Sequence, residues 1–241
     1  NWTSRMDGRQ RLQPTSDEIR VQAYEALANG IQSLYWYSME SWSLAAWRDT
    51  LDTTARIGRE IRLLDRLYEQ GRATLHRRED RFDLNVVAAP DAAILFAIDL
   101  DYQPSPDKTF VWKQPRRMDA RFELPEWLRE AADCFAVSAD GIAPARWEKV
   151  QSGVKVSATV DKVAVWVVTT NPKLRTLMAE RHKQLLAEEA AIGFDPVRNG
   201  EEQKLGHKRD DVARREVLPG LLVVLFVEPP DQLLEHCAHT V

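Results

Sequence analysis

The stretch "GVKVSATVDKVAVWVVTT", residues 153–170, decides the fold class of this chain. Residues 154–159 alternate between apolar and polar side chains, which predicts a strand with one face in water. The run "VAVWVV" in the second half, residues 163–168, is apolar, which predicts a strand at the centre of a sheet. Asp161 supplies a turn signal between the two halves.

Five further runs of strand character lie upstream, separated by Pro, Asp, Gly and Ser turn signals. Together with the opening stretch they give seven short strands at roughly ten-residue spacing, which is typical of an antiparallel β-sandwich. We therefore predict an all-β antiparallel sandwich over residues 76–170. The five runs are "LNVVAA" (84–89), "AAILFAIDLDY" (92–102), "MDARFEL" (118–124), "DCFAVSA" (133–139) and "ARWEKV" (145–150).

The first 75 residues have a different pattern, helix then strand then helix. Thr15 and Glu18 predict a capping box at the start of the first helix, and Gly30 is suited to a left-handed turn at its end. An aromatic strand is predicted over 31–38. A second helix over 44–70 follows, and Gly71 ends it.

A single strand between two long helices is the repeat of an α/β fold with parallel strands, and it cannot form a sheet alone. We therefore interpret residues 1–75 as the last repeat of a (β/α)₈ barrel whose earlier strands lie upstream. The chain starts at Asn1 rather than at a methionine, so we expect a fragment whose N-terminal part, with any signal peptide, is missing. A secreted or periplasmic full-length protein is compatible with this sequence.

The stretch "RLQPTSDEIRVQAYEALANGIQSLYWYSMESW", residues 11–42, resembles the closing segment of bacterial β-galactosidase-like TIM-barrel glycoside hydrolases. A trailing β-sandwich and the run "LLAEEAAIGFDP" (185–196) also match that family, so the likeness covers residues 14–195. Where the family has Ala-His-Gly before its last strand, this chain has Ala28-Asn29-Gly30. The resemblance implies hydrolysis of O-glycosidic bonds in an oligo- or polysaccharide, without a cofactor.

Retaining enzymes of this class use two carboxylates about 5–5.5 Å apart. In the family these lie at the ends of strands four and seven, so the resemblance assigns neither role to a residue of this chain. A sugar subsite is predicted at the end of the last strand, because active sites of these barrels gather at that face. Glu40 is the weak catalytic candidate there, with the alternative that it is a solvated or helix-start carboxylate. The predicted substrate-binding residues are Ser38, Glu40, Trp42, Trp2 and Arg5.

The alternative function is a non-enzymatic sandwich that binds carbohydrate or a partner protein. It depends on exposed tryptophans, and Trp112 and Trp127 are the candidates. Trp127 lies in "LPEWLRE", a predicted turn of helix, where packing under a loop is the competing interpretation. On the first hypothesis, the partner of this chain is the missing N-terminal part of the barrel.

Charge, run length and motif content argue against several other classes of function. The net charge of −4 gives no electrostatic basis for nucleic-acid binding. The apolar run 217–227 is too short to span a bilayer. "HCAH" at 236–239 lacks further metal ligands, so no metal site is predicted. Cys134 is expected to be a buried small residue, and His182 a helix-surface residue.

The C-terminal part begins with a third predicted helix. It covers residues 171–195, with Asn171 as its N-cap and Pro172 in its first turn. Residues 196–241 form a charged segment followed by an apolar tail, and we assign them no function.

Overall fold

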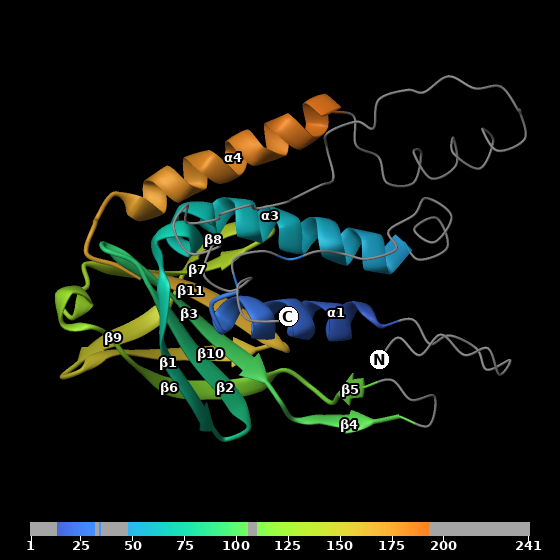
Figure 1. The fold of residues 1–241 in the computed structure, drawn as a ribbon, viewed down its shortest axis with the longest axis horizontal. Helices are drawn as coiled ribbons and strands as arrows, with labels where there is room; N and C mark the ends of the chain where they lie inside the picture. The colour runs from blue at the N-terminus through green and yellow to red at the C-terminus, as the bar shows by residue number, and fades with distance from the viewer. Residues whose placement is uncertain (1–13, 32–33, 35–47, 106–109, 193–241) are drawn as a thin grey trace, which may run out of the picture.

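The computed structural model describes residues 14–31, 34, 48–105 and 110–192. Three helices lie over one face of a six-stranded sheet, and a three-stranded sheet packs against its other face (Figure 1). Every strand pair is antiparallel. The predicted sandwich is therefore confirmed as a β-rich, antiparallel architecture, whereas the barrel origin of residues 1–75 stays a prediction.

All seven predicted strands are present. The six-stranded sheet has the order β1 (Arg72–Glu79), β2 (Phe82–Ala88), β3 (Ala92–Asp99), β11 (Val163–Thr169), β7 (Asp133–Ser138), β8 (Gly141–Pro144). The three-stranded sheet has the order β6 (Arg116–Glu123), β10 (Gly153–Val160), β9 (Arg146–Val150). β4 (Tyr102–Pro104) and β5 (Phe110–Trp112) form a separate hairpin.

The strand "VAVWVV" is central, as predicted, because β11 lies between β3 and β7. The sequence missed β1, β4, β5 and β8, which are short or rich in charge. β1 forms one edge of the six-stranded sheet, and its register with β2 shifts between Ala73 and Leu75.

The first helix, α1 (Ser16–Ala28), has the predicted capping box. The Thr15 hydroxyl accepts from the Glu18 backbone N–H at 3.2 Å, and the Glu18 carboxylate accepts from the Thr15 N–H at 2.6 Å. Gly30 follows with a φ of +85°, a left-handed conformation that glycine adopts without steric cost.

The second helix, α3 (Arg48–Gln70), ends at Gly71 as predicted. A Cβ atom at this glycine would lie 2.4 Å from the Leu67 carbonyl oxygen and 2.6 Å from Val87 Cγ1. Gly71 therefore lets the chain pass directly from α3 into β1 against the sheet. Residues 44–47 of the predicted helix and most of the predicted strand 31–38 lie outside the described residues.

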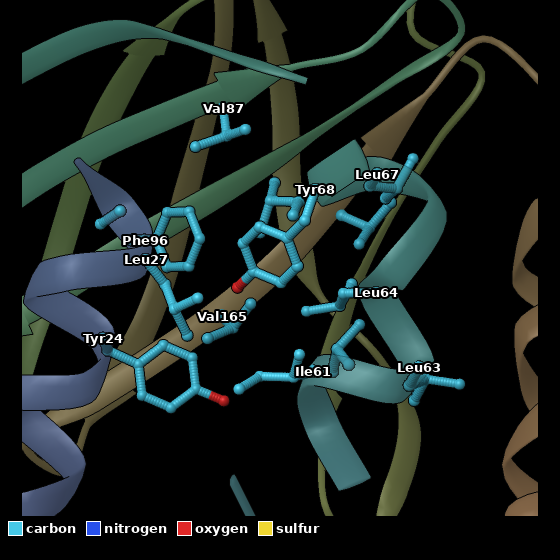
Figure 2. Close-up of a cluster of buried hydrophobic side chains, with 14 of the residues drawn as sticks. Tyr24, Leu27, Ile61, Leu63, Leu64, Leu67, Tyr68, Val87, Phe96 and Val165 are labelled. Atoms are coloured by element: carbon cyan, nitrogen blue, oxygen red, sulfur yellow. The ribbon is translucent and has the colours of Figure 1, made fainter. Parts of the chain in front are cut away.

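The six-stranded sheet is buried on both faces because side chains alternate along each strand. In β3, Ile94 and Phe96 face the helices, and Leu95 faces the three-stranded sheet. We call the first cluster the helix-facing core and the second the sandwich core. Figure 2 shows the helix-facing core, in which Tyr24 of α1 and Tyr68 of α3 lie 6.3 and 6.4 Å from the Phe96 ring.

The third helix, α4 (Leu174–Ile192), starts later than the sequence predicted. Asn171 does not cap it directly: its side chain accepts from the Lys173 N–H at 3.0 Å and forms a turn before the first helical residue. No helix in the described part of the chain is long and apolar enough to cross a membrane.

Candidate functional site

The predicted sugar subsite cannot be compared with the structure. Its residues, Ser38, Glu40, Trp42, Trp2 and Arg5, lie outside the described residues, as does the "HCAH" run at 236–239. These assignments therefore stay predictions. The described residues instead offer three features with polar or aromatic character: a buried network around Glu60, a group of buried polar residues on β2, and a groove beside Trp127.

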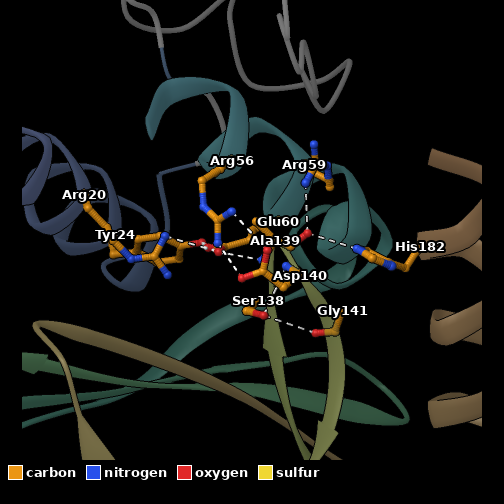
Figure 3. A network of polar contacts seen from close by, with 10 residues as sticks. All are labelled: Arg20, Tyr24, Arg56, Arg59, Glu60, Ser138, Ala139, Asp140, Gly141 and His182. Atoms are coloured by element: carbon orange, nitrogen blue, oxygen red, sulfur yellow. Dashed lines mark hydrogen bonds and ion pairs between the residues drawn. The ribbon is translucent and has the colours of Figure 1, made fainter. Parts of the chain in front are cut away.

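Glu60 is the centre of a buried polar network that joins three elements (Figure 3). It lies on α3 and is 2% exposed. Its carboxylate accepts from Arg20 Nη1 of α1 at 3.2 Å, from the Tyr24 hydroxyl of α1, and from the Ala139 backbone N–H at 2.8 Å. Ala139 belongs to the turn between β7 and β8, so one carboxylate connects both N-terminal helices to the sheet.

Burial raises the pKa of the Glu60 carboxyl above its ordinary value of 4.5, and the neighbouring Arg20 opposes that shift. A raised pKa beside a tyrosine is a feature of many acid/base residues. Here, however, all three partners are groups of the protein that hold the carboxylate in place. The network therefore fits a positioning role, and we do not assign it catalysis.

The carbonyl group of Ala139 in the β7–β8 turn also has side-chain partners. The Ala139 carbonyl accepts from Arg59 Nη1 at 3.0 Å, and His182 Nε2 lies at the same distance from that oxygen. A carbonyl only accepts, so this contact requires the proton of His182 on Nε2. Arg59 Nε also contacts Glu189 of α4 at 3.0 Å.

The prediction that His182 lies on a helix surface is wrong. The imidazole is 8% exposed, because α4 packs this face against the β7–β8 turn. Gly141 in that turn has a φ of +131°, and a Cβ atom there would lie 3.5 Å from the His182 ring. Sequence reasoning missed this buried position because both neighbours of His182 in the sequence, Arg181 and Lys183, are charged.

A second group of buried polar residues lies on β2, on the side that faces the helices. Asp83 is 3% exposed, and its Oδ1 lies 2.8 Å from His76 Nε2 of β1. Asn85 is fully buried, and neither polar atom of its side chain has a hydrogen-bond partner among the described residues. Burial, and then the charge of Asp83, raise the pKa of Glu25 on α1 above its ordinary value.

The groove beside Trp127 is an open concavity of about 450 Å³. We call it the Trp127 groove. It lies where the end of α3 and the start of β1 meet the β2–β3 turn. Its lining residues are Gln70, Arg72, Thr74, Ala88, Ala89, Pro90 and Trp127.

Trp127 is 59% exposed, so it does not pack under a loop, the role that its helical context favoured. It lies on a turn of 3₁₀-helix, η1 (Glu126–Leu128). Leu128 within this turn and Leu124 before it are buried, and Trp127 faces outward. Trp112, the other predicted platform residue, is partly buried, and its indole N–H donates to the Asp99 carbonyl at 2.7 Å. Of the two tryptophans, Trp127 is the one with an exposed ring at a groove.

Neither a reactive thiol nor a metal site is found in the described part of the chain. Cys134 is buried, as predicted, and burial raises the pKa of its thiol to about 12, which keeps it protonated. No group of three or more His, Cys, Asp or Glu residues among the described residues is arranged to hold a metal ion.

Comparison with known proteins adds no assignment: no family model, curated protein or solved structure matches this chain.

The Glu60 network was missed by sequence reasoning, although a signal for it exists. Glu60 falls on the apolar stripe of α3, three residues after Ile57 and four before Leu64. A carboxylate at such a position is buried with its helix face and needs polar partners there. What the sequence does not reveal is that the partners come from α1 and from a turn almost eighty residues away.

Proposed function

We propose that this chain is the C-terminal portion of a β-galactosidase-like TIM-barrel glycoside hydrolase that acts on O-glycosidic bonds. In this proposal the sandwich braces the last barrel repeat. The catalytic carboxylates belong to strands four and seven, which the family resemblance does not match to any residue here.

The observation that carries the proposal is the way α1 and α3 are fixed to the sheet. Both helices contribute to the helix-facing core, and Glu60 ties both to the β7–β8 turn. Residues 29–47 connect the end of α1 to the start of α3. A barrel strand in that segment would therefore begin and end at helices that the sandwich holds in place.

Such a brace serves catalysis indirectly. The predicted subsite residues Ser38, Glu40 and Trp42 follow the predicted strand, so their positions depend on the two flanking helices. Productive sites need side chains held within about 0.5 Å by a rigid scaffold. The Glu60 network gives that rigidity without touching substrate.

The test compares two proteins on a panel of aryl glycosides. One is this 241-residue chain, and the other is the product of the reading frame extended upstream of Asn1. We expect hydrolysis by the extended protein and none by this chain alone. Hydrolysis by this chain alone that is lost in Glu40→Gln would overturn the proposal. An upstream frame without further βα repeats would overturn it equally.

The alternative is a non-enzymatic sandwich module that binds carbohydrate or a partner protein. One specific observation favours it, the exposed indole of Trp127 at the edge of a groove. It predicts ligand binding without hydrolysis in either protein. It gives no role to the predicted helix–strand–helix repeat of residues 1–75, so we rank it second.

A further inference from the structure

The Trp127 groove presents an aromatic ring that is already fixed in position. The indole N–H of Trp127 donates to the Ala89 carbonyl at 3.2 Å, which ties η1 to the β2–β3 turn. Leu128, beside it in η1, is 1% exposed and anchors the turn in the sandwich core. A ligand that stacks on this ring therefore does not have to order it first, which favours affinity.

The groove also carries polar groups at its rim. Gln70, Arg72 and Thr74 are exposed and come from the end of α3 and the first residues of β1. Arg72 Nη1 donates to the Gly71 carbonyl at 2.8 Å, and a guanidinium has further N–H groups that can bind a ligand. The Thr74 hydroxyl donates to the Val86 carbonyl at 3.4 Å, so toward a ligand it is an acceptor, whereas the Arg72 guanidinium donates and the Gln70 amide can do both.

This combination of groups selects one chemical class of ligand. Sugar rings have an apolar C–H face, which stacks on the electron-rich face of an indole, and a rim of hydroxyls, which bond to such polar groups. Arg72 is the one charged residue of the groove lining, so basic peptides are disfavoured. The chain carries a net charge of −4, which disfavours nucleic acid.

We propose that the Trp127 groove binds a saccharide, with one pyranose ring stacked on Trp127 and with hydroxyl groups bonded to Arg72 and Thr74. The groove volume of about 450 Å³ lies within the range of about 300–1,000 Å³ that is usual for small-molecule sites. This site is separate from the predicted subsite at Ser38, Glu40 and Trp42. It does not depend on the barrel proposal, because every residue in it belongs to the described part of the chain.

The test measures binding of four probes to the full chain by titration calorimetry and saturation-transfer NMR. The probes are tetrasaccharides of galactose, glucose and xylose, and a trimer of galacturonic acid. We expect millimolar or tighter binding of at least one probe, weakened by about tenfold or more in Trp127→Ala. Trp127→Phe should keep part of the affinity, because it retains an aromatic face. Arg72→Ala should weaken binding too, and most strongly for the galacturonate if the guanidinium pairs with its carboxylate.

Two matched controls keep the test specific. Phe110→Ala removes another exposed aromatic ring, 43% exposed and outside the groove, and Arg78→Ala removes another exposed arginine of β1. Both should leave binding unchanged, and circular dichroism checks that every variant is folded. Absence of binding by all four probes would overturn the proposal, as would equal losses in Trp127→Ala and Phe110→Ala. Binding is measured without hydrolysis, so its failure is distinguishable from failure of the hydrolase proposal.

Discussion

The six-stranded sheet buries both of its faces, and the residues that cover the two faces differ in kind. The sandwich core is built of apolar side chains such as Leu84, Phe122 and Val156. The helix-facing core also contains apolar side chains, but Glu60, Asp83 and Asn85 are buried beside them. The first face is closed by alternation of apolar residues, whereas the second depends on particular polar contacts. We therefore expect substitutions on the two faces to act through different physical causes.

The largest expected effect is in the sandwich core. Phe122 is fully buried, and its ring lies 6.2 Å from that of Trp166. Phe122→Ala should lower the free energy of unfolding by about 3–5 kcal/mol, because it leaves a cavity between the sheets. Urea denaturation measures this value. Phe110→Ala, at an exposed position, should change it by less than about 0.5 kcal/mol, and similar losses in both variants would contradict the assignment of the core.

Removal of the Glu60 carboxylate tests the helix-facing side. Glu60→Ala leaves Arg20, Tyr24 and the Ala139 N–H without their partner. We expect a loss of roughly 3 kcal/mol, at the lower end for a broken buried ion pair, because Arg20 stays partly in contact with water. In the Glu60→Ala variant, the amide hydrogen exchange of Ala139 should be accelerated relative to the wild-type protein, and more so than that of Val156. A loss below about 0.5 kcal/mol would mean that the network does not hold the helices.

The pH dependence of stability tests the contribution of the Glu60 charge separately from the contribution of its hydrogen bonds. Its folded-state pKa lies above the ordinary value of 4.5, so the folded protein holds the proton more tightly than the unfolded chain. The stability linked to this proton is fully present below the unfolded pKa and is lost as the pH rises through the folded pKa. Relative to Glu60→Gln, which stays neutral, the wild-type protein should therefore lose stability from acidic toward neutral pH. A constant difference across this range would contradict the raised pKa.

A smaller and opposite effect is expected at Asn85. Within the part of the chain that the structure describes, both polar atoms of this fully buried side chain lack hydrogen-bond partners. Asn85→Leu should therefore raise the free energy of unfolding by about 1 kcal/mol, because it removes an unsatisfied amide. Asn85→Asp is the matched control and should lower stability, since it buries a charge. A lower free energy of unfolding for Asn85→Leu would contradict this prediction and indicate that the Asn85 side-chain amide is hydrogen-bonded in the folded protein.

The smallest effect is expected for an exposed ion pair at the β7–β8 turn. Arg56 Nη1 lies 3.0 Å from Asp140 Oδ1, and this contact lowers the pKa of Asp140. Because both side chains are largely exposed, Arg56→Ala should cost less than about 0.5 kcal/mol. A double-mutant cycle with Asp140→Ala isolates the pair. A coupling comparable to the loss in Glu60→Ala would show that surface contacts, too, fix the turn.

Sequence reasoning found the strands because their cause is local. Alternation at Val154 and Val156 and the apolar run around Trp166 follow from which sheet face is buried, and the end of α1 follows from Thr15, Glu18 and Gly30. The pairing of β3 with β11 brings together segments about seventy residues apart. Neither segment's sequence indicates which strand it pairs with, so the order of the strands in the sheet could not be predicted.

The candidate sites were predicted less completely. Trp127 was noted as an exposed tryptophan, but the groove arises only where Gln70 and Arg72 meet the β2–β3 turn in space. The buried positions of Glu60 and His182 likewise depend on contacts across three elements. The resemblance to glycoside hydrolases rests most directly on residues 11–42, and the predicted subsite residues Ser38, Glu40 and Trp42 lie outside the described residues, so the hydrolase function stays a proposal.

The edge strand β1 has a consequence for how the molecule meets copies of itself. Edge strands offer free backbone groups to which another chain can add. In β1 the sequence "RATLHRRE" places four basic residues along that edge, and the register shift between Ala73 and Leu75 breaks its regularity. A second β1 approaching in parallel register would place arginine opposite arginine, and the shifted register would leave a mismatched hydrogen-bond pattern. These features disfavour growth of the sheet into a continuous intermolecular ribbon at its β1 edge.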